Sequence, residues 1–216
     1  MKDTIIQSVK ATEVVVPSKP DSLNSESVHD KDTAFAKKFL TGASWTEFAI
    51  QPKWIIEIKL QNGLTGIGET YRNVSKEFVQ EAINVFRGLD VLKINWRRLP
   101  VNDQRIYEAF ETAVLDVVGK FLHVPIHPEE KQCWRGSEVD LDILETMALH
   151  IAAASINCTF PSDIFGELVR EDDLIEEPIK FEKGAALVPQ GEGLGVSLDN
   201  SALEKYKTGQ DLVSNL

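Results

Sequence analysis

Alternating apolar residues near the start of the chain predict a small antiparallel sheet. Residues 5–16 are rich in β-branched side chains and end at Pro17, which is typical of a strand with one covered face. Every second residue from Trp54 to Leu60 is apolar, so these side chains fall on one side of a second strand. The serine-rich stretch 18–32 between the two strands is predicted to be a loop.

A tight hairpin extends this sheet. Asn62-Gly63 supplies the two positive-φ positions that such a turn needs, and residues 65–69 return as a third strand. The front of the chain is therefore predicted to be a three-stranded meander.

Beyond Asn73 the apolar period changes from two to about 3.6. Residues 78–86 repeat at helical spacing after Ser75, a suitable N-cap. A second helix is predicted over residues 106–121, capped by Asn102 or Asp103 and ended before Pro125. Both helices are expected on one face of the meander.

The second half predicts one long helix and a hairpin. Ser137-Glu-Val-Asp140 suits an N-cap with an acidic first turn, and the helix runs to about Ala154. Its apolar stripe consists of Leu141, Leu144, Met147, Ala148 and Ile151. We expect this stripe to be exposed, which would make residues 128–178 the least stable part of the molecule unless another chain covers them. Residues 179–188, turned at Gly184, are expected to dock on the N-terminal sheet as a hairpin.

Charge and composition exclude several classes of partner. The net charge of −11, with no cluster of basic residues, disfavours nucleic acid and membrane surfaces. The start of the chain lacks an apolar leader, and eighteen apolar residues never run together, so a cytoplasmic location is expected. Cys133 and Cys158 are too few for a disulfide framework and are interpreted as free, buried small hydrophobes.

Four motifs, in this order and spacing, carry a resemblance to a known family: Trp54-Ile-Ile-Glu-Ile-Lys-Leu-Gln-Asn-Gly-Leu-Thr-Gly-Ile-Gly-Glu-Thr70, Ala113-Val-Leu-Asp-Val-Val-Gly-Lys120, Ala148-Leu-His-Ile-Ala-Ala-Ala154 and Gly193-Leu-Gly-Val196. The chain resembles the mandelate racemase and muconate lactonizing enzyme family of the enolase superfamily, whose members pair a capping domain with a metal-dependent barrel. The resemblance implies an α+β fold with a capping domain over residues 1–125, a residual fragment of a TIM-type barrel over 126–178, and a segment over 179–216 that returns to the cap.

The departure from the family is in the barrel. A closed eight-stranded barrel takes about 250 residues, and only residues 126–216 follow the cap. In the family, lysine or histidine bases and three carboxylate ligands for magnesium come from the middle strands. The sequence shows no Lys-x-Lys there and no series of strand-ending carboxylates. We therefore expect no catalytic residue, no metal ligand and no cofactor in this chain, whereas complete members use magnesium.

The same resemblance gives two residues a place near substrate. Residues 133–138 are similar to the last strand and loop of acid-sugar dehydratases in the family, which would make Ser137 and Glu138 substrate-side residues. From the residues alone, Glu138 and Asp140 suit either a general acid and base or an acidic first helical turn.

Other polar motifs favour structural interpretations. His150 shares a helix face with apolar residues and is expected to be packed and hydrogen-bonded. The glycines of 191–195 lack the spacing of a nucleotide loop and predict a turn. The carboxylates of 171–177 are expected to form a solvated surface, with a cation site as the alternative.

Three functions stay open. The first is a truncated enolase-superfamily protein without catalysis of its own. The second is a partial sequence of a magnesium-dependent acid-sugar dehydratase or racemase, acting by proton abstraction next to a carboxylate; its partner would be a carboxylate-bearing small molecule. The third is a non-catalytic interaction or binding module. For the first and third, the expected partner is a second copy of the chain or another chain that covers the barrel fragment.

Overall fold

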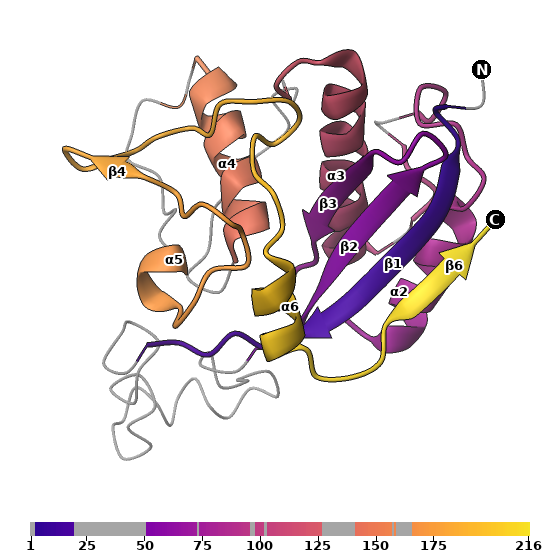
Figure 1. Ribbon diagram of the computed structural model, residues 1–216, viewed down its shortest axis with the longest axis horizontal. Coiled ribbons are helices and arrows are strands. Elements are labelled where there is room, and N and C mark those ends of the chain that lie inside the picture. Colours follow the sequence, from indigo (N-terminus) through magenta and orange to yellow (C-terminus); the bar gives the residue numbers. More distant parts are fainter. Residues whose placement is uncertain are drawn as a thin grey trace.

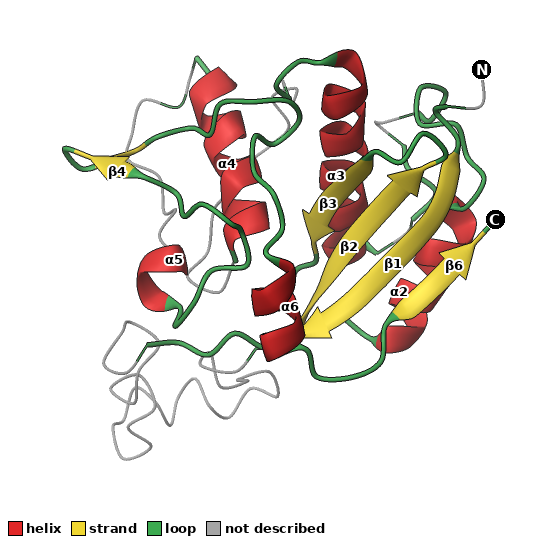
Figure 2. Cartoon of the chain, in the orientation of Figure 1, coloured by secondary structure: helices red, strands yellow, loops and turns green. Residues whose placement is uncertain are grey.

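A four-stranded antiparallel sheet forms the centre of the protein (Figures 1 and 2). The computed structural model describes residues 3–19, 51–72, 74–95, 98–101, 103–126, 141–156, 158 and 166–216. The strands are β1 (Ile6–Val14), β2 (Lys53–Leu60), β3 (Thr65–Glu69) and β6 (Leu212–Asn215), in the order β3-β2-β1-β6. The predicted meander of β1, β2 and β3 is confirmed. The fourth strand, from the end of the chain, was not predicted.

Two helices cover one face of the sheet, as the helical periodicity predicted. They are α2 (Lys76–Phe86) and α3 (Gln104–Leu122). The side chains of Ser75 and Asp103 cap them, accepting from Phe78 N and Arg105 N. The apolar side of β2 from Trp54 to Leu60 lies with both helices in one buried core.

Two glycines of β3 let α3 approach the sheet closely. A Cβ built on Gly66 would lie 2.1 Å from Ala113 O, and one on Gly68 would lie 2.0 Å from Ala109 O. Real carbon and oxygen atoms do not come so near, so any side chain here has to push the helix away from the strand.

The change Gly68→Ala should therefore destabilise the fold by about 1–3 kcal/mol through overpacking. Gly209→Ala is the matched control, because no atom lies within 4 Å of a Cβ at Gly209. The control should change the stability by at most about 0.5 kcal/mol. Urea unfolding of both variants measures the difference, and equal midpoints would contradict the close packing of α3 on β3.

A second buried core fills the other face of the sheet. It joins Ile55 and Ile67 of the sheet to Ile143 and Met147 of α4 (Asp142–Ala154). The short helices α5 (Gly166–Val169) and α6 (Asn200–Tyr206) belong to the same half of the molecule (Figure 1). Residues after α5 complete this core: Leu174, Ile175, Ile179, Leu194, Leu198, Ala202 and Leu203.

The expected exposure of the α4 stripe is wrong. Its five apolar residues are between 1% and 8% exposed. The apolar face finds partners in the sheet and in the C-terminal segment, which sequence periodicity cannot show because they are distant along the chain. Low stability of residues 128–178 was expected because the α4 stripe would be exposed. Since the stripe is buried, this reason does not apply to α4.

The hairpin forms but does not dock where it was predicted. The strands β4 (Phe181–Glu182) and β5 (Ala185–Ala186) pair around Gly184, whose φ is +83°. Figure 1 shows them projecting away from the four-stranded sheet. Phe181, Glu182 and Ala185 are exposed, and only Ala186 of the two strands packs against the second core. The sheet edge is taken instead by β6, in which Leu212 and Ser214 are buried.

Candidate functional site

Charged side chains are buried where the sheet meets α4. Lys53 begins β2 and Glu69 ends β3, and the two side chains are 1% and 0% exposed. Their ammonium and carboxylate groups form an ion pair. A buried charge is costly unless it is paired and hydrogen-bonded, so each of these groups depends on the other.

The same carboxylate caps α4. Glu69 Oε1 accepts the N–H of Leu141 at 2.8 Å, and Oε2 accepts the N–H of Leu144 at 3.0 Å. Leu141 is the N-cap residue of α4 and makes no side-chain cap hydrogen bond. The cap predicted from Ser137 to Asp140 is therefore supplied by a strand residue far along the chain, in the position where negative charge stabilises a helix start.

Two further carboxylates tie α4 to the following segment. Asp142 is 2% exposed, and its Oδ2 accepts the N–H of Leu174 at 2.5 Å. Glu145 is fully buried and accepts the N–H of Gly166. The first turn of α4 thus anchors residues 166–174 through side-chain oxygens.

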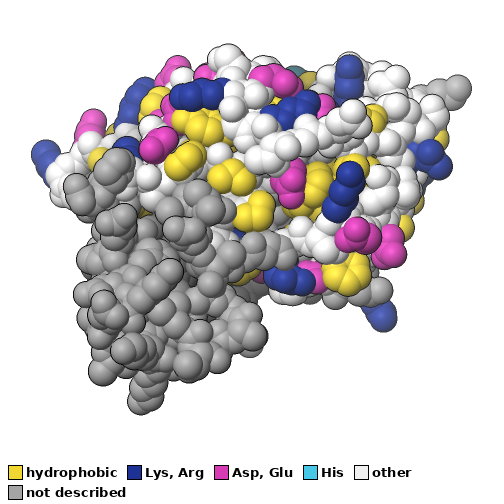
Figure 3. Space-filling model, turned by 90° about the horizontal axis from the view of Figure 1, so that it is seen from below, with side chains coloured by type: hydrophobic (Ala, Val, Ile, Leu, Met, Phe, Trp, Pro, Cys, Tyr) yellow, Lys and Arg dark blue, Asp and Glu magenta, His cyan; other side chains and the backbone are white. Residues whose placement is uncertain are grey.

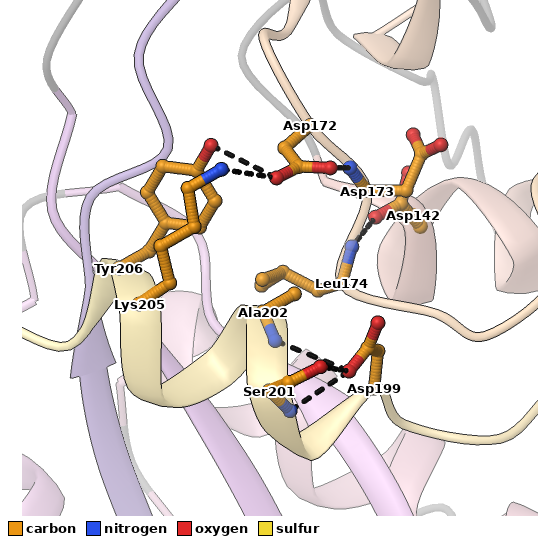
Figure 4. Close-up of polar contacts among 9 residues, drawn as sticks. All are labelled: Asp142, Asp172, Asp173, Leu174, Asp199, Ser201, Ala202, Lys205 and Tyr206. Carbon is orange, nitrogen blue, oxygen red and sulfur yellow. Dashed lines mark hydrogen bonds and ion pairs between the residues drawn. The ribbon is translucent and has the colours of Figure 1, made fainter.

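Asp142 and Asp173 influence each other. Burial raises the pKa of Asp142 well above its usual value, and the negative charges of Asp173 and Glu69 raise it further. Burial also raises the pKa of Asp173, assisted by the charge of Asp172. Figure 4 shows Asp142 and Asp173 as neighbours between α4 and the 172–174 segment.

A separate buried carboxylate, Asp116, joins three parts of the chain. Asp116 Oδ2 accepts Ile67 N at 2.9 Å on the edge of β3 and Lys120 Nζ at 2.8 Å, while Oδ1 accepts Leu194 N at 2.8 Å. The side chain is 0% exposed, and burial raises the pKa of its carboxyl group despite these donors. Gly193 makes this approach possible, because a Cβ there would lie 2.1 Å from Asp116 Oδ1.

These carboxylates act as acceptors for backbone N–H groups, which is structural chemistry. Glu69, Asp116, Asp142 and Glu145 each bind at least one backbone amide. Among the described residues no group of three or more His, Cys, Asp or Glu side chains could hold a metal ion. The donor sets of the described residues therefore do not fit a magnesium site, which needs several carboxylate and water oxygens turned to the ion.

The sequence-predicted site residues have different outcomes. Ser137 and Glu138 lie outside the described residues, so their substrate-side role stays a prediction. His150 is packed as expected: it is buried, and its Nε2 lies 2.9 Å from Leu194 O. Cys158 is in no disulfide, as predicted, but it is exposed rather than buried.

The acidic run of 171–177 is only partly the solvated surface that was expected. Asp172 accepts hydrogen bonds from Lys205 and Tyr206 of α6, and Asp173 turns toward Asp142. Two carboxylates of the run thus serve internal contacts, while Glu171, Glu176 and Glu177 are exposed. The 191–195 segment is a turn, as predicted, with positive φ at all three of its glycines.

Sequence reasoning missed the buried pair of Lys53 and Glu69. The available signal was the position of a lysine directly before the apolar run of β2 and of a glutamate directly after Gly68. Asp116 gave a similar signal, since it interrupts the apolar face of 113–118. A charge inside a buried pattern is paired when it is retained, but its partner lies too far along the chain to be read from local sequence.

The outer surface agrees with the charge argument. On the described face in Figure 3, basic and acidic side chains are interspersed with apolar ones, and no block of basic residues is visible. None of the helices among residues 3–19, 51–126 and 141–216, so far as they are described, is long and apolar enough to cross a membrane.

Comparisons with known proteins find similarity to enolase-like proteins. Residues 130–202 match a family model described as enolase C-terminal domain-like. Muconate cycloisomerase 1 of Rhodococcus opacus is 30% identical over 74 residues, which are 34% of this chain and 20% of that protein. The o-succinylbenzoate synthase of Enterococcus faecalis is 33% identical over 81 residues, 37% of this chain and 22% of that protein. The sequence matches thus span about a fifth of these relatives.

Solved structures show the fold over a larger part of the chain. The 2-chloromuconate cycloisomerase of Rhodococcus opacus aligns with a TM-score of 0.70 and 13% identity, over 96% of this chain and 100% of that chain. The muconate lactonizing enzyme of Pseudomonas fluorescens aligns with a TM-score of 0.69 and 13% identity, over 95% and 100%. The likeness in fold therefore extends from the four-stranded sheet to the C-terminal segment.

Proposed function

Because the chain belongs to the mandelate racemase and muconate lactonizing enzyme family of the enolase superfamily, we propose that it is a truncated member without catalysis of its own. The observation that carries this proposal is the use of the buried carboxylates. Glu69, Asp142 and Glu145 accept backbone amides that fix α4 and its neighbours, which leaves their oxygens committed to the fold.

The length of the chain after the cap supports the same proposal. A closed barrel of alternating strands and helices needs about 200 residues at minimum. In the described part of residues 126–216, every pairing between named strands is antiparallel. A TIM-type barrel consists of parallel strands, so these pairings are not those of a barrel. The helix α4 packs on the four-stranded sheet and not on barrel strands in these pairings.

We expect no turnover when the pure protein is incubated with magnesium and a panel of hydroxy acids, acid sugars and muconate. The reason is that enediolate chemistry needs a metal and a base next to the substrate, and the described carboxylates serve other groups. Product formation followed by chromatography is the measurement. The muconate lactonizing enzyme of Pseudomonas fluorescens serves as positive control, and chelator-sensitive turnover by the chain would refute the proposal.

A partial gene product is the second candidate, favoured by the structural alignments. They extend over the whole length of the solved muconate cycloisomerase chains, so cap and C-terminal segment are both represented. A complete enzyme would then need an inserted coding segment with a base and three carboxylate ligands. The genomic sequence around the codons for residues 123–133 decides between the two candidates.

A binding module is the third candidate, and a groove at the base of the hairpin favours it. The groove has a volume of about 450 Å³ and is lined by residues 176–180, 187–190 and 195–197. This volume falls in the range of small-molecule pockets. Phe181 and Leu187 are exposed at the hairpin, which supports a second copy or another chain as partner. For all three candidate functions we propose a cytoplasmic location.

A further inference from the structure

A short segment, residues 172–174, links α4 to α6 (Figure 4). Leu174 stands at its centre. Its N–H donates to Asp142 Oδ2 in the first turn of α4, and its carbonyl oxygen accepts the N–H of Asp199 at 2.9 Å. Asp199 is the N-cap residue of α6. One residue therefore holds the beginnings of two helices together through its backbone.

Asp172 adds a second connection to α6. Its Oδ2 accepts Lys205 Nζ at 2.7 Å and Tyr206 Oη at 3.1 Å. Both donors belong to the last turn of α6. The segment is thus bonded to both ends of α6 and to the first turn of α4.

Two carboxylates stand side by side at the α4 end of this segment. Asp142 is buried, and Asp173 is half-buried beside it (Figure 4). Two ionised carboxylates repel each other strongly where water is excluded, so such a pair holds a proton over a wide range of pH. Burial raises the pKa of each of the two carboxyl groups.

The surrounding charges do not remove this repulsion. Glu69 of β3 faces Asp142 and adds negative charge, although its own partner is Lys53. Asp172 acts on Asp173 in the same sense, and Lys19 acts in the opposite sense. The other charged groups on the packed elements have different partners. Glu145 accepts from Gly166, and Arg170 donates to Val16 and Ser18. Asp116 and Lys120 bind β3, and Asp116 also binds Leu194.

We propose that residues 172–174 form a proton-linked clasp, in which one proton held between Asp142 and Asp173 keeps Leu174 bonded to α4 and its loss releases the segment and the start of α6. The closed form binds more protons than the open form between pH 3.8, the usual pKa of aspartate, and the raised pKa of the closed form. The clasp is therefore most stable at low pH. Its stability is lost as pH rises toward the raised pKa, by up to about tenfold in the opening equilibrium per pH unit.

Hydrogen exchange of the Leu174 amide tests the clasp. In the wild-type chain its protection factor should fall with rising pH, by up to about tenfold per unit. In Asp142→Asn it should stay level, because the amide oxygen still accepts from Leu174 and the NH₂ group can donate to Asp173. Asp173→Asn should level the profile in the same way, and it supplies the test if Asp142→Asn fails to fold.

Two references make the result specific. The amide of Ile56, in the central strand β2, reports global unfolding, so a parallel fall at Ile56 and Leu174 would overturn the clasp. Asp211→Asn is the matched variant, since the hydrogen bonds from Lys207 and Thr12 lower the pKa of Asp211 against its partial burial. It should leave the slope at Leu174 unchanged. A slope that persists in Asp142→Asn and Asp173→Asn would also refute the proposal.

Discussion

Replacing Glu69 by glutamine should destabilise the protein by about 3–5 kcal/mol, because the change leaves the charge of Lys53 buried without its carboxylate. Lys53 is 1% exposed, so water cannot take the place of the lost partner. The amide of glutamine can still accept one of the two N–H groups of α4 that Glu69 binds, from Leu141 or Leu144. Urea unfolding gives the free energy of unfolding.

Glu57→Gln is the matched control for this prediction. Glu57 lies on the same sheet and pairs with Lys10 at 2.8 Å, but both side chains are partly exposed, at 20% and 31%. The loss of such a pair should cost at most about 1 kcal/mol. The double change Lys53→Met with Glu69→Gln should recover part of the loss, since neither position then carries a buried charge without its partner. Equal losses in Glu69→Gln and Glu57→Gln would show that the Lys53–Glu69 pair is not buried as described.

Replacing Asp116 by alanine should cost about 2–6 kcal/mol. The change leaves the N–H groups of Ile67 and Leu194 buried without an acceptor, and each unsatisfied group costs about 1–3 kcal/mol. Lys120 is 21% exposed and can turn to water, so it should add little to this cost. Unfolding by urea measures the loss, and hydrogen exchange at Ile67 and Leu194 shows whether both contacts open.

Asp199→Ala separates burial from the number of hydrogen bonds. Asp199 also accepts two backbone N–H groups, from Ser201 and Ala202, but it does so at an open helix start. Water can replace the carboxylate there, so the loss should be much smaller than at Asp116. If the two variants were destabilised equally, the central role of Asp116 would have to be abandoned.

Local patterns predicted the elements that depend on near neighbours. The alternation in β2, the Asn62-Gly63 turn and the period of α3 are set by residues within a few positions of one another. A strand or helix buries one face whatever lies opposite it, so its pattern is visible before the fold is known. The motifs of residues 54–70, 113–120 and 148–154 were recognisable for the same reason.

The contacts that close the molecule depend on the tertiary structure. Leu141 and Glu69 are 72 positions apart, and Leu194 and Asp116 are 78 apart. Nothing in the sequence near either partner specifies the other, because a carboxylate can cap any helix start or strand edge that the chain brings to it. The placement of the α4 stripe was decided in the same way, by the second face of the sheet.

The sequence by itself therefore determined the meander, its two covering helices, a third helix that ends near Ala154, and the resemblance to the enolase superfamily. The tertiary structure alone decided that β6 completes the sheet, that α4 is buried against it, and that Glu69, Asp116 and Asp142 hold backbone amides. The physical reason is range. The periodicity of a segment shows which of its faces is buried and which is exposed to water. The pairing of buried charges with distant backbone groups exists only after the chain has folded.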